Sequence, residues 1–338
     1  VESLPLNEEK KFLGVHDSPE GGNVNEIEEK KKKVETFVQR MSNGNLPSHL
    51  GWMAYRYKLW SSVTYGIGTM TNNIEEVKTF LDKTDHKMMN VLGVASTIKK
   101  GWRKLHATFG GIGLYNIVTE QLIEKLNLLL QHYKSHSSVS KKLDTSLAYL
   151  QIQLGVNVCP LDLVYDDWHY LAPLSWVKML WRTLQVTGFE IYLDYDEIVI
   201  VRKRDFVLME KFMELTSGDV EEMKALSRVR GSLNAIFFSD IVTADGKYLE
   251  QHCIKKGGTK IIRSEYHFPR EEPSDEDWDV RLRCLQQLTH ENYEVMTPLG
   301  EWVETSHREW EWFLDKKSSV LCRRRTDDWQ VYLEQNGV

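Results

Sequence analysis

The spacing of apolar residues along the first 187 positions constrains the fold more than any other feature. In the stretches that begin at Val118, Leu143 and Val177, apolar side chains recur every three or four positions, as they do on the buried face of a helix. Asn43, Gly44 and Asn45 interrupt the pattern, and Pro47 suits the first turn of a new helix. We therefore expect an almost wholly helical first half, preceded by a short strand over 11–15.

The pattern changes near Gly188. Residues 189–194 and 198–201 predict paired strands, and helices are expected near 205–215 and 220–230. Asp245 and Gly246 predict a hairpin turn after the apolar stretch 235–242. The expected fold class is α+β, with a mainly helical N-terminal half and a mixed α/β C-terminal half.

The last part of the chain is expected to be a small β-meander. The proline- and acid-rich run 268–275 predicts a linker, and one helix follows it. Three tryptophan-rich or apolar segments separated by turns predict the strands of the meander: 310–314, 319–324 and 329–333.

Composition excludes several classes of protein. No apolar run approaches the roughly 20 residues that cross a bilayer. The cysteines at 159, 253, 284 and 322 are dispersed and contain no Cys-x-x-Cys pair, so we expect an intracellular protein without a metal site. The chain begins Val1-Glu2-Ser3, with neither an initiator Met nor a signal sequence. We interpret both ends as cuts through a longer chain.

Charge is distributed unevenly along the chain. The net charge is −6, but residues 1–150 have an excess of four positive charges and residues 151–338 an excess of ten negative ones. From 86 to 142 there are nine basic residues and two acidic ones. Because a polyanion responds to the local field, this window predicts a nucleic-acid site. The alternative is an ordinary solvated helical face.

The basic turn that follows residue 98 concentrates these charges beside an aromatic side chain and three glycines. Tryptophan can stack on a base, lysine and arginine can neutralise phosphates, and glycine lets a ligand approach the backbone. Phe109 and Tyr115 add further aromatic rings nearby. The predicted nucleic-acid-binding residues are Lys87, Lys99, Lys100, Trp102, Arg103, Lys104, Gly110, Gly111 and Gly113.

The order of short motifs resembles one family. Lys11-Phe12-Leu13-Gly14-Val15, then Leu46-Pro47, then Phe109-Gly110-Gly111-Ile112-Gly113-Leu114, and later Ala244-Asp245-Gly246-Lys247 and Gly300-Glu301-Trp302, resemble retroelement reverse transcriptases just downstream of their catalytic palm. The resemblance implies that Lys11, Phe12, Leu13 and Gly14 belong to a strand pair that grips the primer end. It implies that the helices beyond form a thumb, which closes on an RNA–DNA template–primer duplex.

The resemblance also implies a domain layout and a set of partners. The expected parts are the end of the palm at 1–22, a thumb-like helical domain at 23–134, a helical connector at 135–187, a mixed connection-like region at 188–268, and a linker, helix and meander at 269–338. The partners would be the palm and RNase H domains of the parent protein. Magnesium would belong to the palm, so no cofactor is expected in this chain.

The residues themselves carry no complete catalytic motif. Polymerase chemistry needs acidic residues that hold two metal ions, and the resemblance places their Tyr-x-Asp-Asp turn upstream of Lys11. Asp194 and Asp196 are separated by Tyr195, and Asp245 with Gly246 is explained by a hairpin turn. We therefore expect a non-catalytic fragment that holds nucleic acid. The alternative is a protein-interaction or structural module, or a retroelement remnant, whose acidic C-terminal half binds another protein.

Overall fold

A computed structural model describes most of the chain. The described residues are 10–12, 15–17, 23–71, 75–195, 197–198, 200, 202–233, 235–243, 245–256, 272–301, 312–315 and 320–323, with the backbone alone for the four strands and for residues 76, 77, 80 and 83. The chain divides into two compact units. Unit 1 comprises residues 1–143 and 174–190, and unit 2 comprises residues 144–173 and 191–338.

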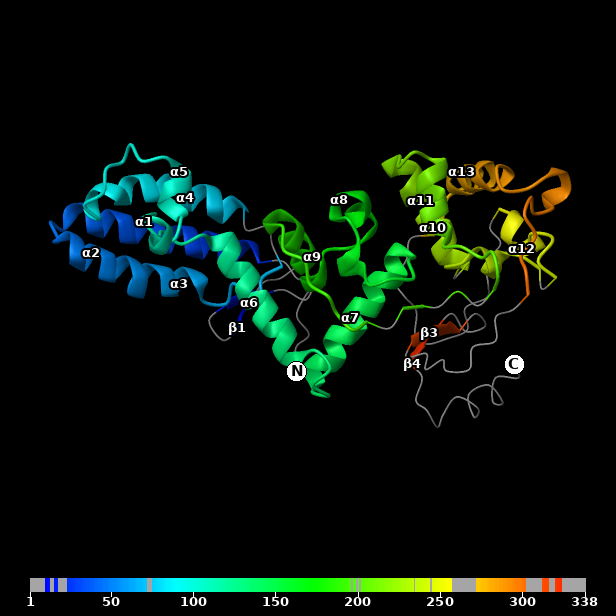
Figure 1. Cartoon of the computed structure of the whole chain (residues 1–338), viewed down its shortest axis with the longest axis horizontal. Helices are drawn as coiled ribbons and strands as arrows, with labels where there is room; N and C mark the ends of the chain where they lie inside the picture. The colour runs from blue at the N-terminus through cyan, green and yellow to red at the C-terminus, as the bar shows by residue number, and fades with distance from the viewer. Residues whose placement is uncertain are drawn as a thin grey trace. The chain divides into compact units, whose positions relative to one another are not determined.

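Unit 1 is helical after a short antiparallel strand pair (Figure 1). Its elements are β1 Lys10–Phe12, β2 Val15–Asp17, α1 Val24–Asn43, α2 Ser48–Ala54, the π-helix η1 Tyr55–Trp60, α3 Ser61–Thr64, α4 Glu75–Val91, α5 Lys100–Lys104, the 3₁₀ turn η2 Ala107–Phe109, α6 Ile117–His132 and α9 Trp176–Thr187. The helix α7 Ser138–Leu154 begins in unit 1 and continues into unit 2. The described residues between 23 and 187 contain no strand, as the apolar spacing predicts.

The ends of these helices follow local sequence signals. Gly44 follows the last turn of α1, and Gly188 ends α9 in the left-handed conformation with φ of 70°, which glycine adopts without steric cost. The Ser175 hydroxyl accepts a hydrogen bond from Lys178 N and so caps the start of α9.

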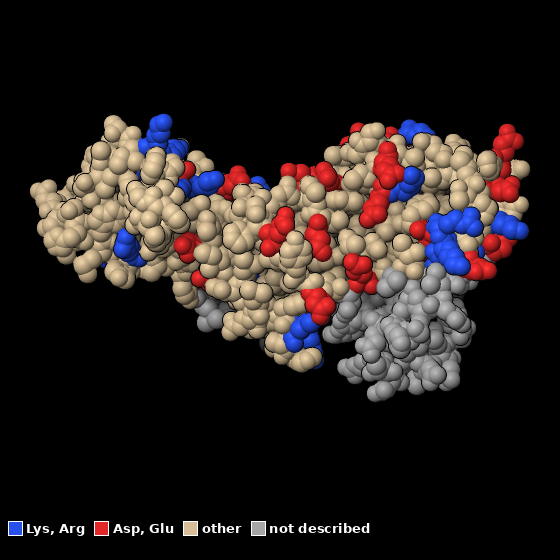
Figure 2. All heavy atoms as spheres, in the orientation of Figure 1, with Lys and Arg blue, Asp and Glu red and all other residues tan. Residues whose placement is uncertain are grey.

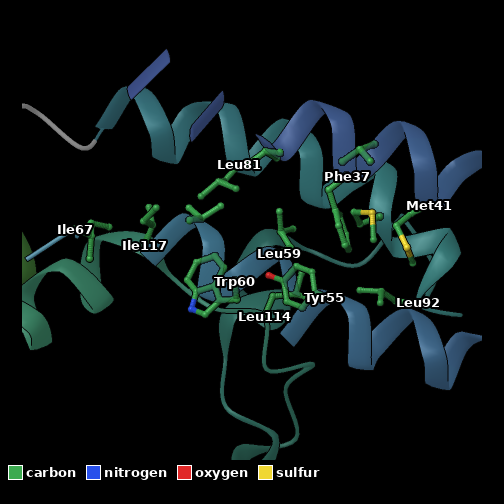
Figure 3. Close-up of a cluster of buried hydrophobic side chains, with 14 of the residues drawn as sticks. Phe37, Met41, Tyr55, Leu59, Trp60, Ile67, Leu81, Leu92, Leu114 and Ile117 are labelled. Atoms are coloured by element: carbon green, nitrogen blue, oxygen red, sulfur yellow. The ribbon is translucent and has the colours of Figure 1, made fainter. Parts of the chain in front are cut away.

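Aromatic and aliphatic side chains from α1, η1, α4 and α6 form the core of unit 1 (Figure 3). Tyr55 and Trp60 come from η1, and Tyr115 stacks on Trp60 with ring centroids 5.0 Å apart. The continuous rod 48–64 contains this π-helical turn, which changes the face that the chain presents to the core. Tyr115 is therefore part of the interior packing, whereas the sequence analysis placed it among the aromatic rings of the nucleic-acid site.

A buried lysine joins α6 to the turn before α4. Lys125 Nζ donates to the carbonyl oxygens of Met70 at 2.7 Å and Gly68 at 3.3 Å, and it lies 4.9 Å from the centroid of the Trp176 ring. Trp176 Nε1 also donates to Gly68 O at 2.7 Å. These long-range bonds assign α9 to unit 1, so the expected connector 135–187 is divided between the two units.

Unit 2 is also mainly helical in its described residues. Beyond its share of α7 its elements are η3 Pro160–Asp162, α8 Tyr165–Trp168, η4 His169–Leu171, α10 Leu208–Leu215, α11 Val220–Leu233, η5 Phe238–Ile241, α12 Gln251–Ile254, α13 Asp275–Gln286, η6 Glu291–Tyr293, β3 Trp312–Asp315 and β4 Val320–Arg323. The helix α11 packs against α10 and α13 (Figure 1).

The strands predicted for the second half are mostly not observed among the described residues. The backbone over 189–194 forms no strand, and the stretch 235–242 contains the 3₁₀ turn η5. Residues 198–201 lie partly outside the described residues. The alternating apolar pattern therefore does not lead to a ladder here, because a strand also needs a partner along its whole length. The mixed α/β character predicted for this half is not shown.

The turn predicted at Asp245 and Gly246 is confirmed. Gly246 has φ of 78° and donates to Thr243 O at 2.8 Å, and Val242 bridges Leu249 across the turn. The strands β3 and β4 pair antiparallel, with Phe313 opposite Cys322. The third strand of the expected meander, over 329–333, lies outside the described residues, so the meander as a whole stays a prediction.

Among the described residues, no helix is both long enough and apolar enough to pass through a membrane.

Candidate nucleic-acid interface

The basic turn forms a compact loop closed by backbone hydrogen bonds. The short helix α5 is followed by η2, after which the chain doubles back along α5. Ile112 N donates to Trp102 O at 3.0 Å, Leu114 N to Arg103 O at 2.8 Å, and Gly113 N to Leu105 O at 2.9 Å. The loop is therefore held in one shape by its own main chain.

The glycines in this loop serve the turn itself. A Cβ atom on Gly111 would lie 2.0 Å from the carbonyl oxygen of Leu105, a distance no side chain tolerates. Gly110 and Gly113 have φ of 79° and 75°, in the region that favours glycine. We predicted these glycines as places where a ligand approaches the backbone, and the structure instead gives each of them a role inside the loop.

Two aromatic rings project from this loop into solvent. Trp102 is 52% exposed and Phe109 is 72% exposed. Large aromatic side chains are more often buried, and a Cβ atom on Gly110 would lie 4.0 Å from the Trp102 ring. The loop thus presents two flat surfaces on which a base can stack.

Of the side chains predicted to bind phosphates, some are exposed and others already have partners within unit 1. Lys87, Lys99 and Lys100 are exposed, and none has an ion-pair partner among the described residues. Lys104 is half-buried and pairs with Asp82 of α4. Arg103 is buried, and its guanidinium donates to Ser96 O and Ile98 O, each at 2.8 Å.

Arg103 is accordingly a structural residue. Its two hydrogen bonds to the preceding carbonyl oxygens of Ser96 and Ile98 organise the segment that leads into α5. Its side chain is therefore not available to the phosphate that we predicted it would bind. Charge alone could not have shown this difference, because Arg103 and Lys100 carry the same charge and only packing decides which of them is buried.

An acidic group lies buried beneath the loop. Burial raises the pKa of Asp85 to about 7, against the opposing effect of Lys104, while the neighbouring Asp82 raises it further. Asp85 is 5% exposed. The surface of the loop thus carries positive charge, and the carboxyl group beneath it is only partly ionised at neutral pH.

Acidic residues are unevenly distributed both along the sequence and over the surface of the folded chain. No acidic residue occurs from 86 to 119. Figure 2 shows acidic side chains concentrated over the part of the molecule that holds the later helices, with few over the helices of residues 24–104. The α5 loop is therefore the segment of unit 1 that is most favourable for an anionic partner.

The primer-grip-like residues are only partly described. Lys11 and Phe12 lie in β1, which pairs with β2 so that Lys11 is opposite His16 and Phe12 opposite Val15. Leu13 and Gly14 lie outside the described residues. The strand pair expected at 1–22 is thus present as a hairpin, and its contact with a primer stays a prediction.

Two carboxylates of unit 2, Asp240 and Asp245, accept hydrogen bonds within local turns. Asp240 Oδ2 accepts from Ile236 N at 2.9 Å and Phe237 N at 3.0 Å. Asp245 Oδ1 accepts from the Thr243 hydroxyl at 2.6 Å and from Lys247 N at 3.1 Å. These bonds stabilise turns, as the hairpin interpretation of Asp245 predicts. Asp194 lies in an irregular segment, without the strands of a catalytic hairpin.

Comparison with known proteins adds no relationship to this description: no family model, no curated protein and no solved structure matches the chain.

Proposed function

We propose that this chain is a nucleic-acid-holding part of a reverse-transcriptase-like polymerase, downstream of the palm, and that it carries out no chemistry itself. The proposal rests on the order of motifs from Lys11 to Trp302 and on the helical character of residues 23–187. Its binding surface is Lys99, Lys100, Trp102 and Phe109, which we call the α5 surface. The template–primer duplex of RNA and DNA is the proposed ligand.

The observation that carries the proposal is the pairing of exposed rings with uncompensated lysines. Trp102 and Phe109 are more than half exposed, and the two lysines lie two and three positions before Trp102. Stacking supplies about 1–3 kcal/mol per base, and each neutralised phosphate adds salt-dependent affinity. Nucleic-acid binding thus supplies a reason for apolar rings to lie in solvent beside positive charge.

The binding experiment compares two double variants of the full chain. Binding of a labelled RNA–DNA hybrid is measured by fluorescence anisotropy across a series of salt concentrations. Lys99→Ala with Lys100→Ala should flatten the log–log salt slope by roughly 1.4–1.8, because each lost phosphate contact removes about 0.7–0.9. Lys32→Ala with Lys58→Ala is the matched control, since both of these lysines are also exposed in unit 1. Equal slopes for the two double variants contradict the proposal.

A glycine pair tests whether the loop shape matters. Gly111→Ala forces a Cβ atom against Leu105 O, whereas a Cβ atom on Gly101 meets nothing within 4 Å. Gly111→Ala should weaken hybrid binding as much as removal of both lysines does, and Gly101→Ala should leave it unchanged. Similar affinities for these two variants would show that the folded loop is not the binding element.

The absence of chemistry is tested separately. With Mg²⁺ or Mn²⁺ and a primed template, the chain should incorporate no labelled nucleotide, because no motif in it supplies the paired carboxylates that hold two metals. Incorporation that disappears in Asp194→Ala would overturn this part of the proposal.

A second candidate function is protein binding through the rod formed by α2 and η1. Leu50, Met53 and Tyr57 are 40%, 55% and 75% exposed, and their spacing places them on one side of the α2–η1 rod. Met53→Asp with Tyr57→Asp separates the two functions, since it should leave hybrid binding intact and abolish only an association with protein.

A further inference from the structure

Three residues around the short helix α12 bring together a carboxylate, an imidazole and a thiol. One ligand atom from each of Glu250, His252 and Cys253 lies within 4.8 Å of the other two. Glu250 and His252 are partly exposed and Cys253 is buried. We expected no metal site because the sequence contains no Cys-x-x-Cys pair, whereas this group contains a single cysteine.

The backbone at this place is held on both sides. Glu250 N donates to Ile241 O at 2.9 Å, Leu249 N donates to Tyr293 O at 3.1 Å, and Cys253 N donates to Glu250 O at 2.9 Å. Bridges join Leu249 to Val242 and Tyr248 to Glu294. The side chains therefore project from a segment whose conformation is fixed without any ligand.

The imidazole of His252 has one engaged and one unengaged nitrogen. Its Nδ1 lies 3.2 Å from Glu250 Oε2. Its Nε2 is buried and has no hydrogen-bond partner. Buried polar atoms are nearly always satisfied, and a carboxylate on one imidazole nitrogen is the usual companion of a metal on the other.

A buried cation near the same thiol is also without a partner. Arg281 of α13 is 0% exposed, and its Nε, Nη1 and Nη2 atoms make no hydrogen bond. Cys253 and Cys284 are the titratable groups close enough to affect it. Lys256, just after α12, pairs with Asp279 of α13 at 2.6 Å, so the two helices lie side by side (Figure 1).

The geometry points to a divalent transition-metal site, best suited to Zn²⁺, formed by His252 and Cys253 with Glu250 as third ligand or as the partner that orients the imidazole. On binding, the Cys253 thiol loses its proton to solvent and the thiolate sulfur bonds to the metal. Arg281 N–H groups then have an anionic sulfur to which they can donate, and His252 Nε2 has a partner.

The dimensions and the donor set agree with zinc. Zn–N bonds of about 2.0–2.1 Å and Zn–S bonds of about 2.3 Å place tetrahedral N and S ligands about 3.5 Å apart. The present separations are at most 4.8 Å, and side-chain rotation can close the difference. A set of two or three protein ligands leaves a position for water, as in open zinc sites.

The test uses Co²⁺ as a spectroscopic probe for zinc in the full chain after treatment with a chelator. One Co²⁺ per chain should bind with a thiolate-to-cobalt charge-transfer absorption, and Zn²⁺ should displace it. Cys253→Ser should abolish the absorption, and His252→Gln should weaken binding at least about tenfold. Cys284→Ser is the matched control, because it removes the other thiol near Arg281 and should retain the signal.

Folding is checked by circular dichroism for every variant, and Glu250→Gln provides a variant at a side chain that is 39% exposed. Glu250→Gln should retain the fold and bind Co²⁺ more weakly than the parent chain. Absence of the charge-transfer signal in the parent chain, or equal affinity in the parent and in Cys253→Ser, overturns the proposal.

Discussion

Two regions of unit 2 each bury an arginine, and the two side chains differ in their hydrogen bonds. In the region where α11 meets the end of α7, Arg230 Nη2 donates to Ile152 O at 2.7 Å and Gln153 O at 3.1 Å, and Nη1 donates to Ala235 O at 3.1 Å. In the region between α12 and α13, Arg281 donates to nothing. Burial lowers the pKa of each guanidinium to about 10, so both remain charged at neutral pH.

Arg230 therefore stabilises the fold through its hydrogen bonds, whereas the guanidinium of Arg281 has no hydrogen-bond partner. Arg230 supplies donors to the last carbonyls of α7, which have no partner within the helix. A buried charge without such bonds is strongly unfavourable, so the Arg281 region is incomplete as it stands. We therefore expect substitution of Arg230 to destabilise unit 2, and substitution of Arg281 to leave its stability nearly unchanged or to increase it.

The largest expected effect is at Arg230. Arg230→Met should lower the free energy of unfolding of unit 2 by about 3–5 kcal/mol, because three buried carbonyl oxygens lose their donor while the volume is nearly kept. Hydrogen exchange of the α7 and α11 amides measures this loss within one unit. A decrease below about 1 kcal/mol would remove the structural half of the comparison.

The pH dependence of the stability of unit 1 provides a similar comparison for its buried cation, Lys125. Burial lowers the pKa of Lys125 to about 7, below its unfolded value, so stability should rise as pH increases from 7 toward 10. Burial raises the pKa of Asp85 to about 7, so its contribution should be lost as pH rises from 4 to 7. Unit 1 should be least stable near pH 7, and its free energy of unfolding should increase by about 1 kcal/mol per pH unit on either side.

Two variants show which group causes the change in stability on each side of pH 7. Lys125→Met should flatten the rise above pH 7, and Asp85→Asn should flatten the fall below it. The measurement is urea unfolding followed by exchange of unit 1 amides at each pH. A profile that both variants leave unchanged would mean that neither group changes its protonation on folding.

A smaller effect is expected at the ring beside Lys125. Trp176→Phe removes the Nε1 hydrogen bond to Gly68 O and weakens the contact with the ammonium group, for a loss of about 1–2 kcal/mol. Thermal unfolding of the full chain at pH 6 and pH 9 measures it. The loss should be greater at pH 6, where Lys125 is charged, and a larger loss at pH 9 would contradict the cation–π contact.

The smallest effect on stability is expected at Arg281. Arg281→Met should change the free energy of unfolding of the metal-free chain by less than about 1 kcal/mol, or stabilise it, because no hydrogen bond is lost and a buried charge disappears. A loss as large as that of Arg230→Met would show that Arg281 already has a stabilising role without any ligand.

The helices were predictable because their signals are local. The stripe from Val118 to Leu129, the interruption at Gly44 and the end at Gly188 each depend on a few neighbouring residues, and α6, α1 and α9 follow them. The expected strands over 189–194 failed because an alternating pattern specifies a face and not a partner. The Asp245–Gly246 turn was predictable, since its geometry is set by two adjacent residues.

The candidate site was predictable as a segment but not residue by residue. Lys99, Lys100 and Trp102 are exposed as predicted, yet Arg103 is buried and Lys104 is paired with Asp82, 22 positions away in the chain. Tyr115 also turned inward, onto the Trp60 ring. Which member of a basic cluster remains free depends on contacts that the local sequence does not contain.

The sequence by itself determined the helical character of residues 23–187, its punctuation by glycine and the positive charge around Lys99. The tertiary structure alone decided which buried cations have partners, and it placed Arg281 of α13 near the Cys253 thiol. The physical reason is range. Helical periodicity and turn geometry act over a few residues, whereas burial and hydrogen-bond satisfaction of a side chain such as Arg281 depend on every element that packs around it.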